Sequence, residues 1–212
     1  EIKETLNDAG SVWLKFAQAI SQMKDFVSDD LALALEPLWY DCKIHDHEIS
    51  KHIIARELGD DYDTTSMKFL GSGSMAQTYK VFYAPTKTWV CVKVMHPGAP
   101  EEIHDAIRAY DAVKDSFLFP SQFKNISWMF FESLKTQVDF KAEYEMGMKM
   151  WEMYQTTNLW YDGDRGRPVV VVPKPIHHTT SCLVMECEES VHIVWSNVDE
   201  MCAKYNPITV VF

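Results

Sequence analysis

Apolar residues recur at three- and four-residue spacing through the first 60 positions of the chain, which predicts helices there. Residues 10–26 carry one apolar stripe with a polar face beside it. Residues 28–34 begin with a Ser-Asp-Asp sequence that is typical of a helix start. A third helix is expected after Asp46 and should end at Gly59, because glycine often follows the last helical turn. The amino-terminal part of the chain is therefore predicted to be helical.

The pattern changes at Met67, where short runs of β-branched and aromatic residues begin. Three strands are expected, at 67–70, 77–84 and 88–95. Two longer helices are expected at 99–118 and at about 125–157, and two further short strands at 169–172 and 181–186. This order predicts an α+β fold in which a small antiparallel sheet is combined with long helices.

Composition and charge narrow the class of protein. The chain has 212 residues, of which 47% are apolar and 13% aromatic, and this is enough to build a globular core. Its formal net charge of -11 opposes a broad phosphate-binding surface, so we expect no nucleic-acid partner. Five cysteines without a C-x-x-C pair are expected to be free thiols of a reducing compartment. No apolar stretch is long enough to predict a membrane span.

Candidate chemistry lies in a glycine-serine loop, residues 71–74, and in a lysine about twenty positions later. Strand alternation places Cys91 and Lys93 on one face and the neighbouring valines on the other. A lysine on a partly buried face needs a counter-charge, and Asp139 and Glu143 stand at i and i+4 of a predicted helix. We therefore expect an ion pair between Lys93 and Glu143. The simpler alternative is an ordinary turn between strands followed by a lysine at a strand edge.

The order of these features resembles the UbiB-type atypical kinase-like family, also called aarF-domain-containing kinases. The resemblance rests on a K-x-G-Q-like helix, a nucleotide loop, a lysine strand with a following Pro-Gly turn, an E-x-D-like motif with a helix glutamate, and a hinge strand. In this chain the K-x-G-Q-like helix corresponds to residues 14–21, the nucleotide loop to 70–80, and the lysine strand with its turn to 90–93 and 96–98. The E-x-D-like motif corresponds to 137–140 with Glu143, and the hinge strand to 183–186. The resemblance covers roughly residues 9 to 190.

The resemblance implies a protein-kinase-like N-lobe preceded by a helical extension. The implied divisions are 1–66 for the extension, 67–190 for the N-lobe and 191–212 for a tail or the start of a C-lobe. Lys93 would contact nucleotide phosphates and pair with Glu143, Lys15 and Gln18 would reach over the cleft, and Asp139 would face Mg²⁺. The residues implied to bind ATP or ADP are Gly71, Ser72, Gly73, Ser74, Met75, Ala76, Gln77, Cys91, Lys93 and Glu186.

Several positions depart from the family pattern. Ala17 stands at the glycine of K-x-G-Q, the nucleotide loop carries glycine and serine instead of alanines, and Gln137 replaces an acidic residue. Residues 187–212 contain neither a catalytic loop nor a D-F-G motif, so this chain by itself is not expected to catalyse phosphoryl transfer. Two interpretations remain open. The chain is either part of a nucleotide-binding kinase or ATPase-like protein, or an inactive lobe that serves as a subunit of a larger complex.

The resemblance also implies partners and a compartment. Family members act in ubiquinone or other isoprenoid-lipid metabolism, so an isoprenoid lipid or a membrane surface is an expected partner. The implied location is the matrix side of mitochondria, with a plastid or another organelle as the alternative.

Histidines and methionines offer weaker candidates. The groups around His45, His47 and His52, and the pair His177 and His178, lack the spacing of a metal site, so solvated loop histidines are expected. The methionines at 146, 148, 150 and 153 are expected to pack in the core of a long helix, although an adaptable contact surface is the alternative.

Overall fold

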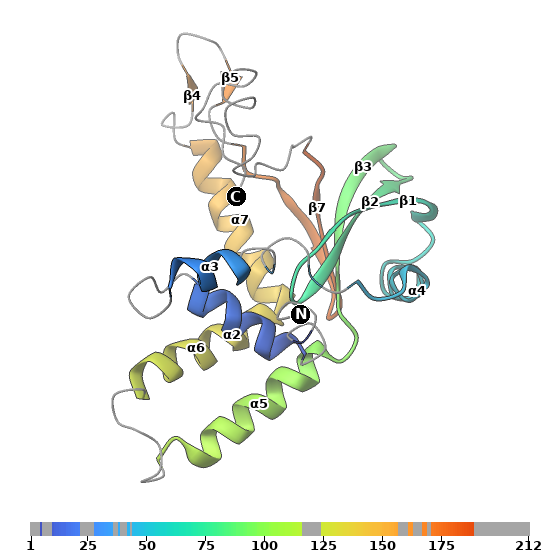
Figure 1. Ribbon diagram of the computed structural model, residues 1–212. Helices are drawn as coiled ribbons and strands as arrows, with labels where there is room; N and C mark the ends of the chain where they lie inside the picture. The colour runs from blue at the N-terminus through green and yellow to red at the C-terminus, as the bar shows by residue number, and fades with distance from the viewer. Residues whose placement is uncertain are drawn as a thin grey trace.

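The protein combines two helical segments with one central sheet (Figure 1). The computed structural model describes residues 5, 10–21, 28–35, 38, 42, 44–115, 124–156, 161–162, 167–168 and 171–188. The helices are α2 (Ser11–Ser21), α3 (Asp29–Leu35), α4 (His47–Leu58), α5 (Ala99–Val113), α6 (Lys124–Gln137) and α7 (Phe140–Thr156). The strands are β1 (Tyr62–Ser72), β2 (Ala76–Tyr83), β3 (Thr88–Met95), β4 (Tyr161–Asp162), β5 (Arg167–Pro168), β6 (Pro175–His178) and β7 (Cys182–Glu186).

The main sheet has five strands in the order β1-β2-β3-β7-β6, and all neighbouring strands are antiparallel. Strand β3 is its centre, with Lys93 opposite Thr78 of β2 on one side and Leu183 of β7 on the other. The helices α5, α6 and α7 are inserted between β3 and β6. This is the α+β kinase-like N-lobe arrangement that the sequence predicts, with helices before the sheet.

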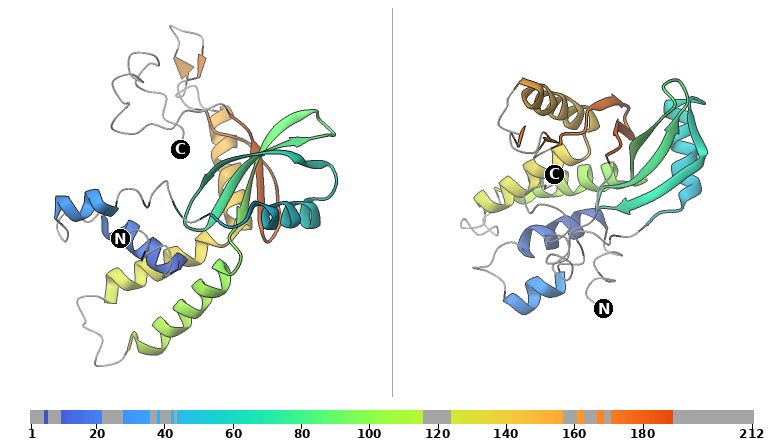
Figure 2. Two further views of the ribbon diagram at one scale, coloured as in Figure 1. Left: turned by 45° about the vertical axis from the view of Figure 1, so that its right-hand side comes forward. Right: turned by 90° about the horizontal axis from the view of Figure 1, so that it is seen from above.

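The sheet separates two apolar cores. On one face, the valines of β3 pack with Tyr79, Val184 and Ile54, and Ile54 comes from helix α4. On the other face, Leu183 packs with side chains of the inserted helices, among them Ile103 and Leu134. Figure 2 shows α4 beside the sheet and away from the group formed by α2, α5 and α6. Each face of β3 is therefore covered by helices from a different part of the sequence.

The region predicted as one long helix is two helices, α6 and α7. The break falls at Val138 and Asp139, and Asp139 Oδ1 accepts a hydrogen bond of 3.0 Å from the backbone N–H of Ala142. An aspartate that binds a backbone N–H three positions later caps the start of a helix, which explains why a new helix begins at Phe140.

Two other elements differ from the sequence-based expectation. Strand β1 begins already at Tyr62. The strand that precedes β7 is formed by Pro175–His178 instead of 169–172. Val171 and Val172 lie outside any strand, and residues 169–170 lie outside the described part of the chain.

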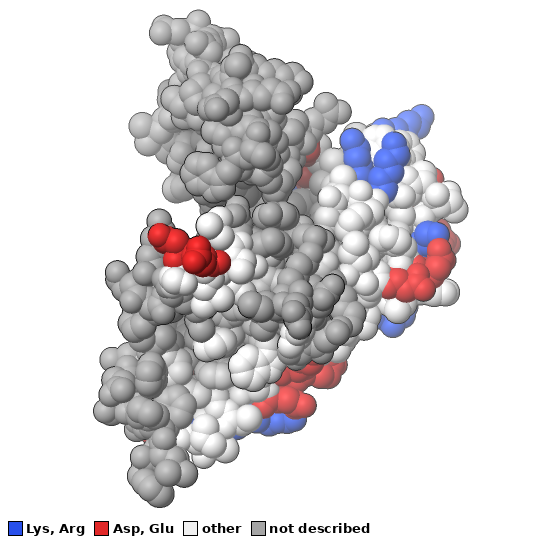
Figure 3. Space-filling view, in the orientation of Figure 1, with Lys and Arg blue, Asp and Glu red and all other residues white. Residues whose placement is uncertain are grey.

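The charged side chains are unevenly distributed over the surface. Figure 3 shows acidic groups over α3, whose first turn carries Asp29 and Asp30, and basic groups gathered at one end of the sheet. At Trp89 of β3, the ammonium groups of Lys68 and Lys80 lie 5.6 and 5.8 Å from the ring centroid. Among the described residues, no helix has the length and apolar character needed to cross a bilayer.

Candidate functional site

Lys93 lies on the face of β3 opposite the valine core. Val90, Val92 and Val94 are all buried in the core beneath α4, so alternation directs Cys91 and Lys93 to the other face, toward the inserted helices. This placement of Cys91 and Lys93 confirms what the alternation of β3 predicts.

Glu143 reaches Lys93 from the first turn of α7. Its Oε1 accepts a hydrogen bond from Lys93 Nζ at 2.5 Å, and the two side chains are 29% (Lys93) and 40% (Glu143) exposed. The Lys93 ammonium also lies 5.5 Å from the centroid of the Phe140 ring. The expected ion pair is thus present, and the carboxylate supplies the counter-charge that a half-buried lysine requires.

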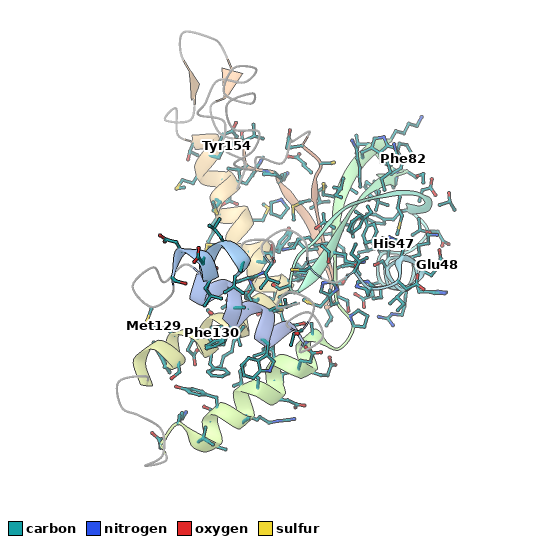
Figure 4. The ribbon with its side chains drawn as sticks, in the orientation of Figure 1. His47, Glu48, Phe82, Met129, Phe130 and Tyr154 are labelled. Atoms are coloured by element: carbon teal, nitrogen blue, oxygen red, sulfur yellow. The ribbon has the colours of Figure 1, made fainter. Side chains whose placement is uncertain are left out.

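Helix α2 brings a second ammonium group toward Lys93. The helix is held to α5 by Ser11, whose backbone N–H donates to Glu102 Oε2 at 2.9 Å. It is held to α6 by Phe16, whose ring centroid lies 5.5 Å from that of Phe130. Figure 4 labels Phe130 on α6. Burial lowers the pKa of Lys15 from its usual value, Cys42 acts in the opposite direction, and the Lys93 ammonium lowers it further. The Lys15 charge therefore interacts with that of Lys93.

Gln18 of the same helix points inward. Its side chain is 4% exposed, and its Nε2 donates to the Leu38 carbonyl oxygen at 2.6 Å. The Gln18 Oε1 atom is buried and has no hydrogen-bond partner within the described part of the chain. The Gln18 amide is therefore used within the amino-terminal helices, and the contact across the cleft that the resemblance implies for Lys15 and Gln18 stays a prediction.

The glycine-serine loop turns tightly between β1 and β2. The backbone N–H of Gly73 donates to the Ala76 carbonyl at 2.9 Å, while the side chains of Ser74 and Met75 are buried. Met75 packs into the second core with Leu183. Neither Gly71 nor Gly73 has a positive φ, so the loop takes a conformation that other residues can adopt.

Gln77 lies on the opposite face of the sheet from Lys93. It pairs with Val94 in the β2–β3 register, and its side chain is fully buried. Its Oε1 accepts from the backbone N–H of His45 at 2.6 Å, and its Nε2 donates to the Tyr79 hydroxyl at 2.6 Å. The Gln77 amide therefore braces the segment before α4, and its backbone is the part that belongs to the loop.

The hinge-side residues are Cys91 and Glu186. Burial raises the pKa of the Cys91 thiol to about 12, with a further contribution from the neighbouring Cys187 thiol, so Cys91 is neutral at physiological pH. Glu186 pairs with Val90 and accepts a hydrogen bond of 3.1 Å from the Lys174 backbone N–H. Cys91 thus offers an apolar surface on the Lys93 face, and Glu186 ties β7 to the segment before β6.

Within the described residues, side chains alone do not form a metal site. The described residues contain no group of three or more His, Cys, Asp or Glu side chains that could hold a metal ion. One oxygen of Asp139 caps α7, which leaves its second carboxylate oxygen for another ligand. A Mg²⁺ ion at Asp139 would therefore take most of its ligands from phosphate oxygens and water, as this ion commonly does.

Sequence reasoning missed a set of hydrogen-bonded side chains behind the loop. Instead of a solvated loop residue, His45 is half-buried and lies with its Nδ1 2.8 Å from Nδ1 of His96. These two residues are 51 positions apart, so no local spacing signals their contact.

This combination of a lysine strand, a paired helix glutamate and a glycine-serine loop defines an atypical kinase-like N-lobe. The model of the ABC1 atypical kinase-like domain family matches residues 41–209, and the chain belongs to this family.

Curated relatives agree with this assignment. The chain is 29% identical over 110 residues to the probable protein kinase UbiB of Shewanella loihica, which covers 49% of this chain and 20% of that protein. It is 24% identical over 191 residues to the probable serine/threonine-protein kinase abkC of Dictyostelium discoideum, which covers 84% of this chain and 26% of that protein. The matched regions thus span between a fifth and about a quarter of the length of these relatives.

Proposed function

We propose that this chain binds ATP or ADP with Mg²⁺ as the N-lobe of a kinase or ATPase-like protein. The observation that carries the proposal is the ion pair between Lys93 and Glu143, 2.5 Å long, with the Lys15 ammonium close enough to act on Lys93. In kinase-like folds a strand lysine that is held by a helix glutamate contacts nucleotide phosphates. The second cation adds positive charge where a phosphate group would lie.

The residues divide the expected work among them. Lys93 and Lys15 would bind phosphate oxygens, and the backbone of the loop 71–76 would cover them. Glu143 would orient Lys93, and Asp139 would contact the Mg²⁺ ion. The apolar surface near Cys91 would lie beside the base.

Calorimetric titration with Mg-ATP and Mg-ADP tests the proposal. Lys93→Met should weaken binding about 10- to 100-fold, the effect of losing a charge-assisted hydrogen bond. Lys135→Met is the matched control, because Lys135 forms an ion pair of the same 2.5 Å length with Glu132 on α6. Equal affinities of the wild type and Lys93→Met would refute the phosphate site.

A second candidate function is an inactive lobe that acts as a structural subunit of a larger assembly. The observation that favours it is the burial of the loop side chains, since Met75 and Ala76 are part of the apolar core. A wild-type protein that is folded but binds neither nucleotide at millimolar concentration would support this function over the first.

The family resemblance also supports a proposed role in ubiquinone or other isoprenoid-lipid metabolism on the matrix side of mitochondria. An isoprenoid lipid or a membrane surface would then be a partner. Quinone content in cells that lack the protein, together with the location of the tagged protein, tests this role. Unchanged quinone content would count against it.

A further inference from the structure

A chain of hydrogen bonds connects the glycine-serine loop to helix α4. His96 Nε2 lies 2.8 Å from the Gly73 carbonyl oxygen, and His96 Nδ1 lies 2.8 Å from His45 Nδ1. His45 Nε2 lies 2.7 Å from the Ser50 hydroxyl, which is fully buried in α4. Two imidazole rings thus connect a loop carbonyl to a buried helix side chain.

The Gly73 carbonyl oxygen at one end of this series of hydrogen bonds determines which group donates in each of them. A carbonyl oxygen only accepts, so His96 must donate through Nε2, and a neutral His96 then accepts at Nδ1. His45 must therefore donate through Nδ1, which leaves its Nε2 to accept from the Ser50 hydroxyl. One arrangement of protons satisfies all three contacts while both rings are neutral.

The backbone holds both rings in place. The backbone N–H of His96 donates to the Met75 carbonyl at 2.9 Å. The Gln77 side chain accepts from the backbone N–H of His45 at 2.6 Å and donates to its carbonyl at 3.3 Å. The rings are therefore fixed relative to the loop on one side and to the start of α4 on the other.

We propose that His96 and His45 are positioning residues that hold the loop Gly71–Ser74 in the conformation that covers nucleotide phosphates. The proposal rests on the proposed function for the identity of the ligand, whereas the hydrogen bonds that hold the loop do not depend on it. A Gly73 carbonyl that is bound to His96 cannot turn its partial negative charge toward a phosphate. The loop is thus prepared for an anion before one binds, which lowers the cost of ordering it.

Protons should loosen this connection only in acid. The groups that face His45 are His96, His47 and Asp46, and Glu102 faces His96. Burial and the neighbouring imidazoles lower the pKa of His45 to about 4, and burial also lowers the pKa of His96. One added proton is compatible with the chain, but a second would bring two Nδ1–H groups face to face.

Imidazole nitrogen NMR on the wild-type protein at neutral pH tests the direction of the chain. We expect His96 to carry its proton on Nε2 and His45 to carry its proton on Nδ1. The opposite protonation of either ring would overturn the proposal, and this measurement needs neither a variant nor a ligand.

A pair of variants tests the effect on the loop. His96→Gln places an amide N–H near the position of Nε2, whereas His96→Asn reaches only the position of Nδ1 and loses the bond to Gly73. Without nucleotide, amide exchange of residues 71–76 should be about five- to tenfold faster in His96→Asn than in the wild type, the effect of one hydrogen bond. His96→Gln should restore slow exchange. Equal exchange in both variants would overturn the proposal.

Nucleotide affinity separates this proposal from the proposed function. If the wild type binds nucleotide, His96→Asn should bind it several-fold more weakly than His96→Gln at equal global stability, and equal affinities would overturn the positioning role. If the wild type binds no nucleotide, the proposed function fails, and the positioning role for nucleotide binding fails with it. The exchange of residues 71–76 would then still show whether His96 holds the loop.

Discussion

Acidification should destabilise this protein through His45 well before most carboxylates titrate. The pKa of His45 is lowered to about 4, first by burial and then by His96 and His47, with Asp46 acting in the opposite direction. In the unfolded chain the same group titrates near its ordinary value of 6.5. Between these two values the unfolded state binds the proton and the folded state does not, so the free energy of unfolding falls as the pH falls from about 6.5 toward 4.

The size of this effect can be worked out from the two pKa values. The two pKa values imply that the free energy of unfolding is about 2 kcal/mol lower at pH 5 than at pH 7, because the His45 ring is still largely neutral in the folded state. At still lower pH the loss approaches about 3 kcal/mol. His45 is only half-buried, so solvent screening reduces this figure, and we expect a loss of about 1 kcal/mol at pH 5.

Urea denaturation of the wild type and of His45→Asn at pH 7, 6 and 5 isolates the contribution of this histidine. The variant is less stable at pH 7 because it loses the contact with Ser50, but the His45 component of the pH dependence should be missing from it. Carboxylates titrate in both proteins and cancel in the difference. A wild type and a variant that lose the same stability between pH 7 and 5 would refute the reasoning.

Three further predictions concern substitutions at four positions. A Cβ at Gly147 of α7 would lie 2.7 Å from Pro175 Cγ of β6. Gly147→Ala should therefore lower the free energy of unfolding in urea by about 1–3 kcal/mol, in spite of the better helix propensity of alanine. An unchanged denaturation midpoint would contradict this packing. A Cβ at Gly71 meets nothing within 4 Å, and a Cβ at Gly73 meets only the Ala76 carbonyl oxygen at 3.7 Å. Alanine at either position should therefore change the free energy of unfolding by less than about 0.5 kcal/mol. A larger loss would contradict the unstrained backbone of this loop. Asp139→Ala should lower the free energy of unfolding by about 1 kcal/mol, whereas Asp139→Asn should leave it unchanged, because both aspartate and asparagine cap helices. Both variants should bind Mg-nucleotide more weakly, because each loses the carboxylate that is expected to contact Mg²⁺.

The face of β3 on which Lys93 lies could be predicted from the sequence alone. Alternation with period two is a local property of a strand, and the three valines at 90, 92 and 94 mark the buried face without knowledge of any partner strand. The pairing of Lys93 with Glu143 cannot be predicted from local spacing, because 50 positions separate the two residues. The need for a counter-charge and the family resemblance are what point to Glu143. The start of α4 at Asp46 was likewise predictable, since its side chain accepts from the backbone N–H of Glu48 two residues later.

Gln77 shows what the sequence could not supply. The family resemblance assigns it to the nucleotide loop, although the sequence pattern also predicts that a strand begins at this residue. Which face it occupies depends on the register of β2 against β3, and a slip of one residue would reverse the assignment. The register pairs Gln77 with Val94, which places its amide in the core beneath α4. The break before α7 was missed because the apolar pattern continues through it, whereas the cap of Asp139 depends on the backbone geometry at one residue.

The Lys93–Glu143 ion pair and the hydrogen bonds of His96 and His45 both start from strand β3 or from the residue that follows it. Lys93 connects β3 to α7 on one face through Glu143, and three positions later His96 connects the end of β3 to α4 through His45. Lys93 is therefore held by α7, and the Gly73 carbonyl is connected to α4 through His96 and His45. The loop side chain of Met75 packs in the same apolar core as α7. Because α4 and α7 pack on opposite faces of the sheet, the loop is held from both sides, by hydrogen bonds toward α4 and by apolar packing toward α7. A ligand that touches both Lys93 and the loop would therefore contact groups that are held from both faces of the sheet.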